Sequence, residues 1–539
     1  MQVHVRSEYP EPENTACAMK FSEIINDQQL ATEAIRRWIT VAICMVVSVV
    51  VADWIASQQF FFLALLAGVA VLAFVTIGMQ RSAWLLIIVA WRFTGEIHAL
   101  PVPLASRDVV VLVVTFSYFA QRVFGQTARR STGALGALVL INCGWLALTF
   151  VCHPVGLHTF GAETMGARPY FNTFVSLCAY WVIVHLPESY KGVTRIPLWL
   201  LASITFTTLI SVVVYISPSA TPYVWFFYSD VDVTGYLGSL RQTGAETLVH
   251  RLIAFGPFGV MLIQFLSAYY PPRKLLNPLR WQFYLSLLAL VAILASGFRS
   301  GLAFAMACVA LAAWFHRGWR DVILGGITGA ILLGFLVFGQ GRLFDLPLPA
   351  QRALGSFPGQ WDESVKGQVA TSNSRWIWWR QIVAEGAVKN WWIGDGFGVS
   401  ERDYESIIGG RVNFEQGADI TGALHNGPLT TLRFAGAVGL VLFYVLMIAG
   451  AVSSVKCVRR CRGTPLFPVA LFLAMDLVWT PIHYTFIFGG YDAQLPEQMF
   501  LTALLVLVWR MSERPPPSTE PAVIARPLYW NNGGARVSV

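Results

Sequence analysis

Apolar runs alternate with short polar connections along most of the 539-residue chain. An α-helix needs roughly 20 apolar residues to cross a hydrocarbon core of about 30 Å. The pattern therefore predicts an all-α polytopic integral membrane protein with about 12–14 transmembrane helices. The fourteen candidates are residues 38–55, 60–79, 83–97, 109–124, 134–152, 171–186, 197–216, 252–270, 281–295, 301–315, 322–338, 429–455, 466–488 and 495–509.

A long polar stretch, residues 340–426, interrupts this pattern. Because it is too polar to cross a bilayer, we expect a large loop with short helices at one membrane face. The first residues lack the basic, apolar and small-residue order of a cleavable signal peptide. The predicted parts are a cytoplasmic N-terminal segment (1–37), helices 1–11 (38–338), the loop (339–427), helices 12–14 (428–510) and a disordered cytoplasmic tail (511–539).

Composition and charge agree with a membrane protein and predict its orientation. Hydrophobic residues make up 55% of the chain and charged residues 13%, and the mean hydropathy is +0.57. Most of the 38 Lys and Arg residues fall in alternate connections, which the positive-inside rule assigns to the cytoplasm, so the large loop faces outward. The net charge of +8 then reflects connections that face anionic lipid headgroups. No basic stripe interleaved with aromatic residues is present, so nucleic-acid binding is not expected.

The eight cysteines are scattered along the chain, and none falls in the large loop. This distribution does not suggest a disulfide framework. Cys457 and Cys461 lie in a basic connection without a second pair of ligands, so a zinc site is not expected. The sequence predicts ordinary thiols and no metal.

Polar groups break the apolar pattern at four places on the predicted outer face. Ionisable groups at membrane depth are costly and tend to mark function. The four segments are Arg241-Gln242-Thr243-Gly244 with Arg251 before the eighth helix, Ser296-Gly297-Phe298-Arg299-Ser300-Gly301 between the ninth and tenth, Asn373-Ser374-Arg375-Trp376 in the loop, and His425-Asn426 at the start of the twelfth.

Arg299 stands in a predicted turn of two or three residues flanked by Gly and Ser. Such a turn holds an arginine at the interface with little freedom to retract. The planar guanidinium is suited to a phosphate, whose oxygens it bonds in a bidentate way. The alternative is an arginine that extends to lipid headgroups without a ligand.

The loop contains a run of tryptophans that predicts a helix beginning after Ser374 as its N-cap. Trp376, Trp379 and Val383 would share one face, which lies either on the membrane surface or under sugar rings. A tight glycine turn is expected over residues 390–398. Its glycine spacing is not a nucleotide-binding fingerprint, because no strand precedes it.

His425 is a lone histidine, and such residues are more often structural than catalytic. Its position favours a functional role, since it starts a helix on the predicted face that holds Arg251, Arg299 and Arg375. An imidazole with a pKa near 6.5 can accept a proton from a hydroxyl at neutral pH.

Together these motifs resemble the O-antigen ligase and polymerase family of bacterial envelope glycosyltransferases. The resemblance rests on the Ser-Gly-x-Arg-Ser-Gly turn, the Asn-Ser-Arg segment of the loop, the Trp-Ile-Gly-Asp-Gly-Phe-Gly stretch and the closing His-Asn-Gly-Pro-Leu. It covers roughly residues 241–455, and the first seven predicted helices match only in general character.

The resemblance implies a metal-independent, multi-pass enzyme of the bacterial inner membrane, without a cofactor and with its active site facing the periplasm. Its donor would be a glycan on undecaprenyl diphosphate. Its acceptor would be a hydroxyl of lipid A core or of another lipid-linked glycan, as in lipopolysaccharide or exopolysaccharide biosynthesis. By position, His425 and Arg299 would be catalytic, and Arg251, Arg299 and Arg375 would bind the diphosphate. Further candidates for substrate binding are Arg241, Asn426 and Trp376.

The sequence departs from the family pattern in two respects. Arg241 and Arg251 both compete for the family's arginine before the Ser-x-Arg hairpin, and we favour Arg251. Many members have an acidic residue soon after the His-Asn motif, where this chain has Arg433. We therefore assign no role to a carboxylate there.

Two functions of other classes remain alternatives. A polysaccharide transporter or flippase would also have many helices, but it predicts repeats, broken helices and ionisable groups near mid-helix, such as Asp476. A non-catalytic scaffold would leave the four polar segments without a purpose. Neither the sugar nor the choice between ligase and polymerase follows from the residues.

Overall fold

The computed structural model describes residues 41, 45, 48, 60–79, 82–97, 104–123, 132–154, 166–186, 189–229, 252–384, 386, 388–398 and 424–513. The predicted N-terminal segment, most of the first predicted helix, most of the predicted C-terminal tail, Arg241 and Arg251 lie outside this set. Contacts divide the chain into residues 1–75 and 76–539. In the first unit, the described residues are three isolated positions and the first part of helix α2 (Phe60–Met79).

The second unit is helical almost throughout its described residues. Among its described residues, six helices are long and apolar enough to cross a membrane: α5, α8, α14, α15, α20 and α21. The prediction of an all-helical polytopic membrane protein is confirmed. Its helices are α3 (Trp84–Ala90), α4 (Ser106–Val123), α5 (Gly133–Cys152), α6 (Ala167–His185), α7 (Tyr190–Thr194), α8 (Ile196–Ile216), α9 (Thr221–Phe227), α11 (Phe255–Tyr269), α12 (Pro272–Leu275), α13 (Trp281–Ser296), α14 (Arg299–Arg317), α15 (Trp319–Gly339), α16 (Leu348–Leu354), α17 (Glu363–Ala384), α20 (Gly427–Arg460), α21 (Phe467–Phe486) and α22 (Tyr491–Ser512).

The third predicted helix, residues 83–97, is wrong. Helix α3 has 7 residues, about 10 Å, which is too short to cross a bilayer. The chain then forms strand β1 (Glu96–Ile97), which pairs antiparallel with β2 (Leu104–Ala105). Two charged side chains inside this run have polar partners that a lipid-facing helix would not provide. Arg92 donates to Glu497 at 3.0 Å, and Glu96 lies 3.4 Å from Arg168.

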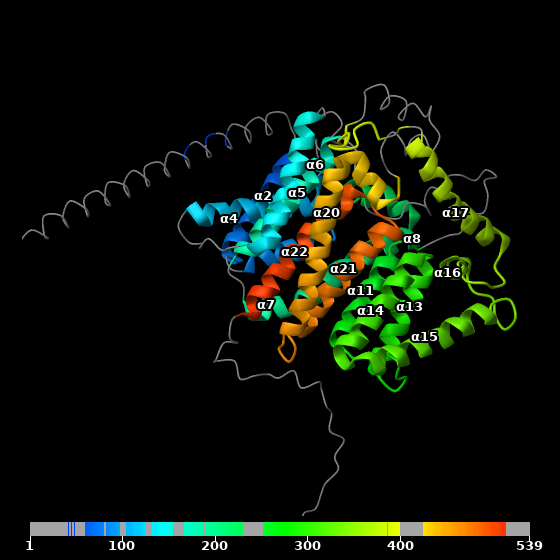
Figure 1. The fold of residues 1–539 in the computed structure, drawn as a ribbon. Helices are drawn as coiled ribbons and strands as arrows, with labels where there is room; N and C mark the ends of the chain where they lie inside the picture. The colour runs from blue at the N-terminus through cyan, green and yellow to red at the C-terminus, as the bar shows by residue number, and fades with distance from the viewer. Residues whose placement is uncertain are drawn as a thin grey trace, which may run out of the picture. The chain divides into compact units, whose positions relative to one another are not determined.

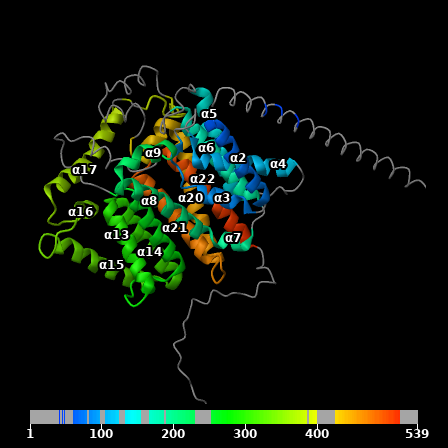
Figure 2. The ribbon, with the colours of Figure 1, turned by 180° about the vertical axis from the view of Figure 1, so that it is seen from behind.

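Helices α20, α21 and α22 form the centre of this unit (Figures 1 and 2). Helix α20 packs on α5, and α22 packs on α6; α21 contacts α11 and α14, which themselves pack together. The core is rich in buried aromatic rings. The ring of Phe443 lies 5.1 Å from that of Tyr484 and 5.4 Å from that of Tyr491.

Helices α14 and α21 run antiparallel, which places the start of one beside the end of the other. Phe304 stacks on Trp479 at 5.7 Å near one end, and His316 lies 5.3 Å from Phe467 at the other. Helix α20 starts beside the end of α21, because Gly427 packs against Tyr484. The starts of α14 and α20 and the end of α21 therefore share one end of the bundle, called here the loop end.

Helix α20 is broken at Gly436, where φ is 69° and ψ is −176°. The break frees backbone groups that need partners, since lipid offers none. Residues 390–398, the glycine turn, supply these partners. The bonds run from Ala437 N–H to Trp391 O at 2.7 Å, from Val438 N–H to Trp392 O at 3.4 Å, from Asp395 N–H to Arg433 O at 2.7 Å and from Gly396 N–H to Phe434 O at 3.1 Å.

Gly436→Ala should destabilise the protein severely. The backbone conformation of Gly436 is essentially restricted to glycine and costs another residue about 1–3 kcal/mol. A Cβ there would also lie 2.2 Å from the Trp392 carbonyl oxygen, which is backbone and has little room to move. Thermal unfolding of the purified protein in detergent measures the loss.

Gly329→Ala is the matched control, because a Cβ at this position in α15 would meet nothing within 4 Å. This variant should unfold at or above the wild-type temperature, since alanine favours a helix over glycine. Equal melting temperatures for both variants would contradict the account of the break.

Candidate functional site

A tight turn connects α13 and α14 as predicted, but Arg299 stands directly after it rather than within it. Helix α13 ends at Ser296, Gly297 takes a left-handed conformation with φ of 69°, and Phe298 directly precedes α14. Arg299 is thus the first residue of α14. This short connection holds the residue at the loop end.

The Arg299 side chain points to the first helix of the large loop. Its Nε donates to the backbone oxygen of Arg352 in α16 at 3.2 Å. The contact ties the guanidinium to protein, which differs from the alternative of an arginine extended only to lipid headgroups. It also brings Arg352 to the site, a residue that the sequence did not single out.

The start of α11 packs against the same turn. Leu252 donates its N–H to Ala295 O at 3.3 Å, and Gly256 packs against the Ser296 side chain. Leu252 directly follows Arg251 in the sequence. Arg251 and Arg241 are themselves outside the described residues, so their predicted roles stay predictions.

His425 lies in an unusual backbone conformation at the start of α20. Its φ of 53° is in the left-handed region, where non-glycine residues are uncommon and often mark functional sites. Its ring stacks on that of Phe488 at 5.0 Å and an interplanar angle of 28°. The half-buried imidazole therefore has a defined position next to the end of α21.

Asn426 is the N-cap of α20. Its Oδ1 accepts a hydrogen bond from Leu429 N–H at 3.0 Å, which satisfies one of the amides left open at a helix start. The predicted substrate contact of Asn426 is untested, whereas this capping role is explicit in the structure.

The loop helix α17 begins earlier than predicted. It starts at Glu363, after Asp362, and Ser374 lies inside it rather than at its N-cap. The Asp362 carboxylate accepts from the N–H and hydroxyl of Ser364, and these bonds lower the pKa of Asp362. An earlier cap thus competes with Ser374 for the helix start. Arg375 and Trp376 are in α17, but their side chains lie outside the described residues.

The predicted aromatic face of α17 is only partly as expected. Trp379 donates its ring N–H to Leu424 O at 2.9 Å, and Ile382 is buried with Leu424 and Leu429. This part of the face packs on protein instead of lying on the membrane surface, whereas Val383 is 42% exposed. Helix α17 is therefore fastened to the residue directly before His425.

A line of rings crosses the loop end between the two best-placed candidates. From the stacked pair of Phe304 and Trp479, the line continues to His483 at 6.3 Å and on to Phe488 at 6.4 Å. At one end of this line, Phe304 belongs to the same helix as Arg299. At the other end, the ring of Phe488 stacks on the ring of His425. The structure thus brings Arg299 and His425 to the same end of the bundle, on helices that both pack against α21.

Residues 284–444 match the family model described as O-antigen ligase. The matched range begins inside α13, contains the turn with Arg299, the loop helices and the glycine turn, and ends inside α20. The chain contains an O-antigen ligase domain. A search of curated proteins finds no match to this chain.

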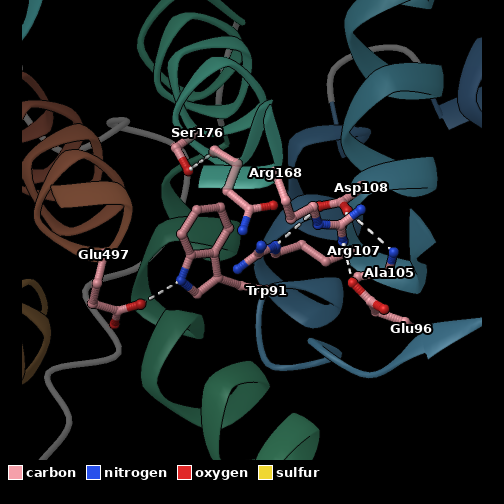
Figure 3. A network of polar contacts seen from close by, with 9 residues as sticks. Trp91, Glu96, Ala105, Arg107, Asp108, Arg168, Ser176 and Glu497 are labelled. Carbon is pink, nitrogen blue, oxygen red and sulfur yellow. Dashed lines mark hydrogen bonds and ion pairs between the residues drawn. The ribbon is translucent and has the colours of Figure 1, made fainter. Parts of the chain in front are cut away.

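A buried charged network lies outside the O-antigen ligase domain and was missed by the sequence analysis (Figure 3). Arg168 Nη2 lies 2.8 Å from Asp108 Oδ2 and 3.4 Å from Glu96 Oε1, and Arg107 Nε lies 3.4 Å from Asp108 Oδ1. Asp108 is fully buried and Arg168 is 2% exposed. Two arginines and two carboxylates balance one another, which indicates a role in holding α4 and α6 together.

A related contact ties the two residues directly after α3 to α22. Glu497 accepts from the Trp91 ring N–H at 2.7 Å and from Arg92 at 3.0 Å. The signal for these groups was present in the sequence, because Arg92, Glu96 and Glu497 all fall inside apolar runs, where ionisable residues need partners. Among the described residues, no group of three or more His, Cys, Asp or Glu side chains forms a metal site.

Substitutions of Asn426 separate its capping role from a substrate contact in the O-antigen ligase domain. Asn426→Ala should cost about 1 kcal/mol of stability, whereas Asn426→Ser should retain the cap and melt near the wild type. Thermal unfolding and transfer activity are measured side by side. If both variants melt like the wild type and lose transfer equally, Asn426 contacts substrate rather than serving the helix start.

Proposed function

We propose that the protein is a glycosyltransferase that moves a glycan from undecaprenyl diphosphate to an acceptor hydroxyl at the periplasmic face of the bacterial inner membrane. The O-antigen ligase family comprises membrane enzymes of polysaccharide assembly, which use lipid-linked glycans. The observation that carries the proposal is the placement of Arg299 and His425 at one end of the bundle, both within the matched range.

In the proposed reaction, the acceptor hydroxyl oxygen attacks the anomeric carbon of the donor. The bond from that carbon to the diphosphate oxygen breaks, and undecaprenyl diphosphate leaves with the bonding electrons. His425 takes the proton of the acceptor hydroxyl, as a general base near neutral pH can. The activated bond supplies the driving force, so neither ATP nor another nucleotide is consumed.

Negative charge grows on the departing diphosphate, and fixed arginines stabilise it more in the transition state than in the ground state. Arg299, held against α16, binds a phosphate group at the start of α14. We assign Arg251, which directly precedes Leu252 in the sequence, to the same diphosphate. Arg375 closes the site from α17, and Trp376 contacts a sugar ring. Arg241 is the second choice for the position of Arg251.

Reconstitution of the purified protein in liposomes tests this function. Undecaprenyl-diphosphate oligosaccharide is supplied alone and then with lipid A core, each mixture is run without and with EDTA, and the products are sized on a gel. A ladder from donor alone identifies a polymerase, and one shifted band that requires lipid A core identifies a ligase. No product from either mixture would contradict the proposal and favour a transporter, and loss of product on adding EDTA would contradict metal independence.

His425→Ala and His425→Asn should both reduce transfer by at least about a hundredfold, because each removes the general base. Asparagine tolerates the left-handed conformation of this residue, so His425→Asn preserves the backbone while removing the imidazole. Initial rates in liposomes and thermal unfolding are compared with the wild type. Full activity of the well-folded His425→Asn protein would refute the assignment.

Arg299→Lys tests whether this residue binds the diphosphate or only reaches the lipid surface. Lysine keeps the charge but not the planar fork, so kcat/KM for the donor should fall about 10- to 100-fold. Donor titrations with the purified protein measure the effect. A lysine variant as active as the wild type would favour an arginine extended to headgroups.

A further inference from the structure

The position of His425 depends on the short helical segment that follows it, which the break at Gly436 separates from the rest of α20. Residues 427–435 form the first segment of α20, between the Asn426 cap and the break at Gly436. Helical hydrogen bonding does not continue normally through the break, so other contacts must fix the segment. On the α21 side, the hydroxyls of Thr431 and Tyr484 bond to each other. On the other side, the segment meets the glycine turn.

An ion pair joins the glycine turn to this segment. Arg433 Nη1 lies 2.7 Å from Asp395 Oδ2, and the two side chains are only 13% and 14% exposed. Charges so far removed from water attract each other more strongly than at a surface, and loss of one partner leaves the other poorly solvated. The pair therefore strengthens the backbone bonds that fill the break.

The Asp395 carboxylate also organises the chain that leads back to α17. It accepts hydrogen bonds from the N–H groups of Lys389 at 3.0 Å and Asn390 at 2.9 Å. These residues follow the end of α17, the helix that contains Arg375. One carboxylate thus connects the loop helix to the segment that begins after His425.

A different role for Arg433 would be direct binding of the donor diphosphate. The ion pair with Asp395 argues against it, because this carboxylate already neutralises the guanidinium. The turn is also built around the carboxylate through two backbone N–H groups. The arrangement favours a fixed joint over a ligand site.

We propose that Asp395 and Arg433 are a positioning pair, which locks the glycine turn into the break of α20 and so sets the place of His425 relative to α17. This inference rests on the proposed function, in which His425 acts on the acceptor. The pair acts through His425 and the loop, and it touches neither donor nor acceptor.

Kinetics of Arg433→Gln, Asp395→Asn and the double variant test the pair in liposomes. Each should lower kcat by about 10- to 100-fold, because a small displacement of a catalytic group is costly. The KM for the donor should remain within about twofold, since the phosphate-binding arginines are unchanged. The double variant should lose little more than either single one, as expected of two residues that act together.

Two further variants serve as controls. Arg433→Lys should stay within about threefold of wild-type kcat, because lysine keeps a positive charge that can pair with Asp395. Arg460→Gln removes an ion pair with Glu513 at the other end of α20 and should leave transfer unchanged. An unchanged kcat in Arg433→Gln would overturn the inference. A raised donor KM with unchanged kcat would do the same and make Arg433 a diphosphate ligand.

Hydrogen–deuterium exchange separates failure of this inference from failure of the proposed function. In Arg433→Gln, the amides of Asp395, Gly396 and Ala437 should exchange faster, because each bonds across the break. Arg460→Gln should leave them protected. If the amides exchange faster in Arg433→Gln but the wild type shows no transfer, the proposed function is refuted, whereas the structural role of the Asp395–Arg433 pair is supported. Unchanged exchange in Arg433→Gln would refute the proposal that the Asp395–Arg433 pair locks the glycine turn into the break of α20.

Discussion

The arrangement of this protein depends on one constraint: a backbone group that leaves a helix inside a bilayer must find its partner within the protein. Helix α20 is interrupted at Gly436, and the glycine turn supplies the missing donors and acceptors. Because of this constraint, the large loop cannot be an independent appendage. One part of it is built into the bundle beside the helix that begins after His425.

Two helices of the loop, α16 and α17, contact the bundle at different points. At its beginning, α16 accepts the hydrogen bond of Arg299, and later α17 bonds through Trp379 to Leu424. The first contact lies at the start of α14 and the second just before α20. Helices α14 and α20 both pack on α21. Just after the end of α21, the ring of Phe488 stacks on the ring of His425. The loop and three helices thus shape one region at the loop end.

Buried charges away from this region follow a simpler rule. Arg168 sits between Asp108 and Glu96, and Gln264 donates to Asp476 Oδ2 at 2.6 Å inside the bundle. Each charge has a polar partner, as burial in a low dielectric requires. Such groups explain the folding of α4, α6, α11 and α21 without a transport function. The broken helix α20 also has a local explanation, since protein fills the break.

The sequence by itself determined the membrane class, most helix positions and the turn before Arg299, because these follow from hydropathy and from glycine at a helix end. It also indicated the segments of the candidate site, since polar motifs stand out against apolar runs. Tertiary structure alone decided that residues 83–97 do not form a spanning helix, because Arg92 and Glu96 find partners far away in sequence. It likewise decided the early start of α17, the inward packing of Trp379 and the pairing of Asp395 with Arg433. Those features depend on contacts between segments distant along the chain, and hydrophobic periodicity carries no information about them.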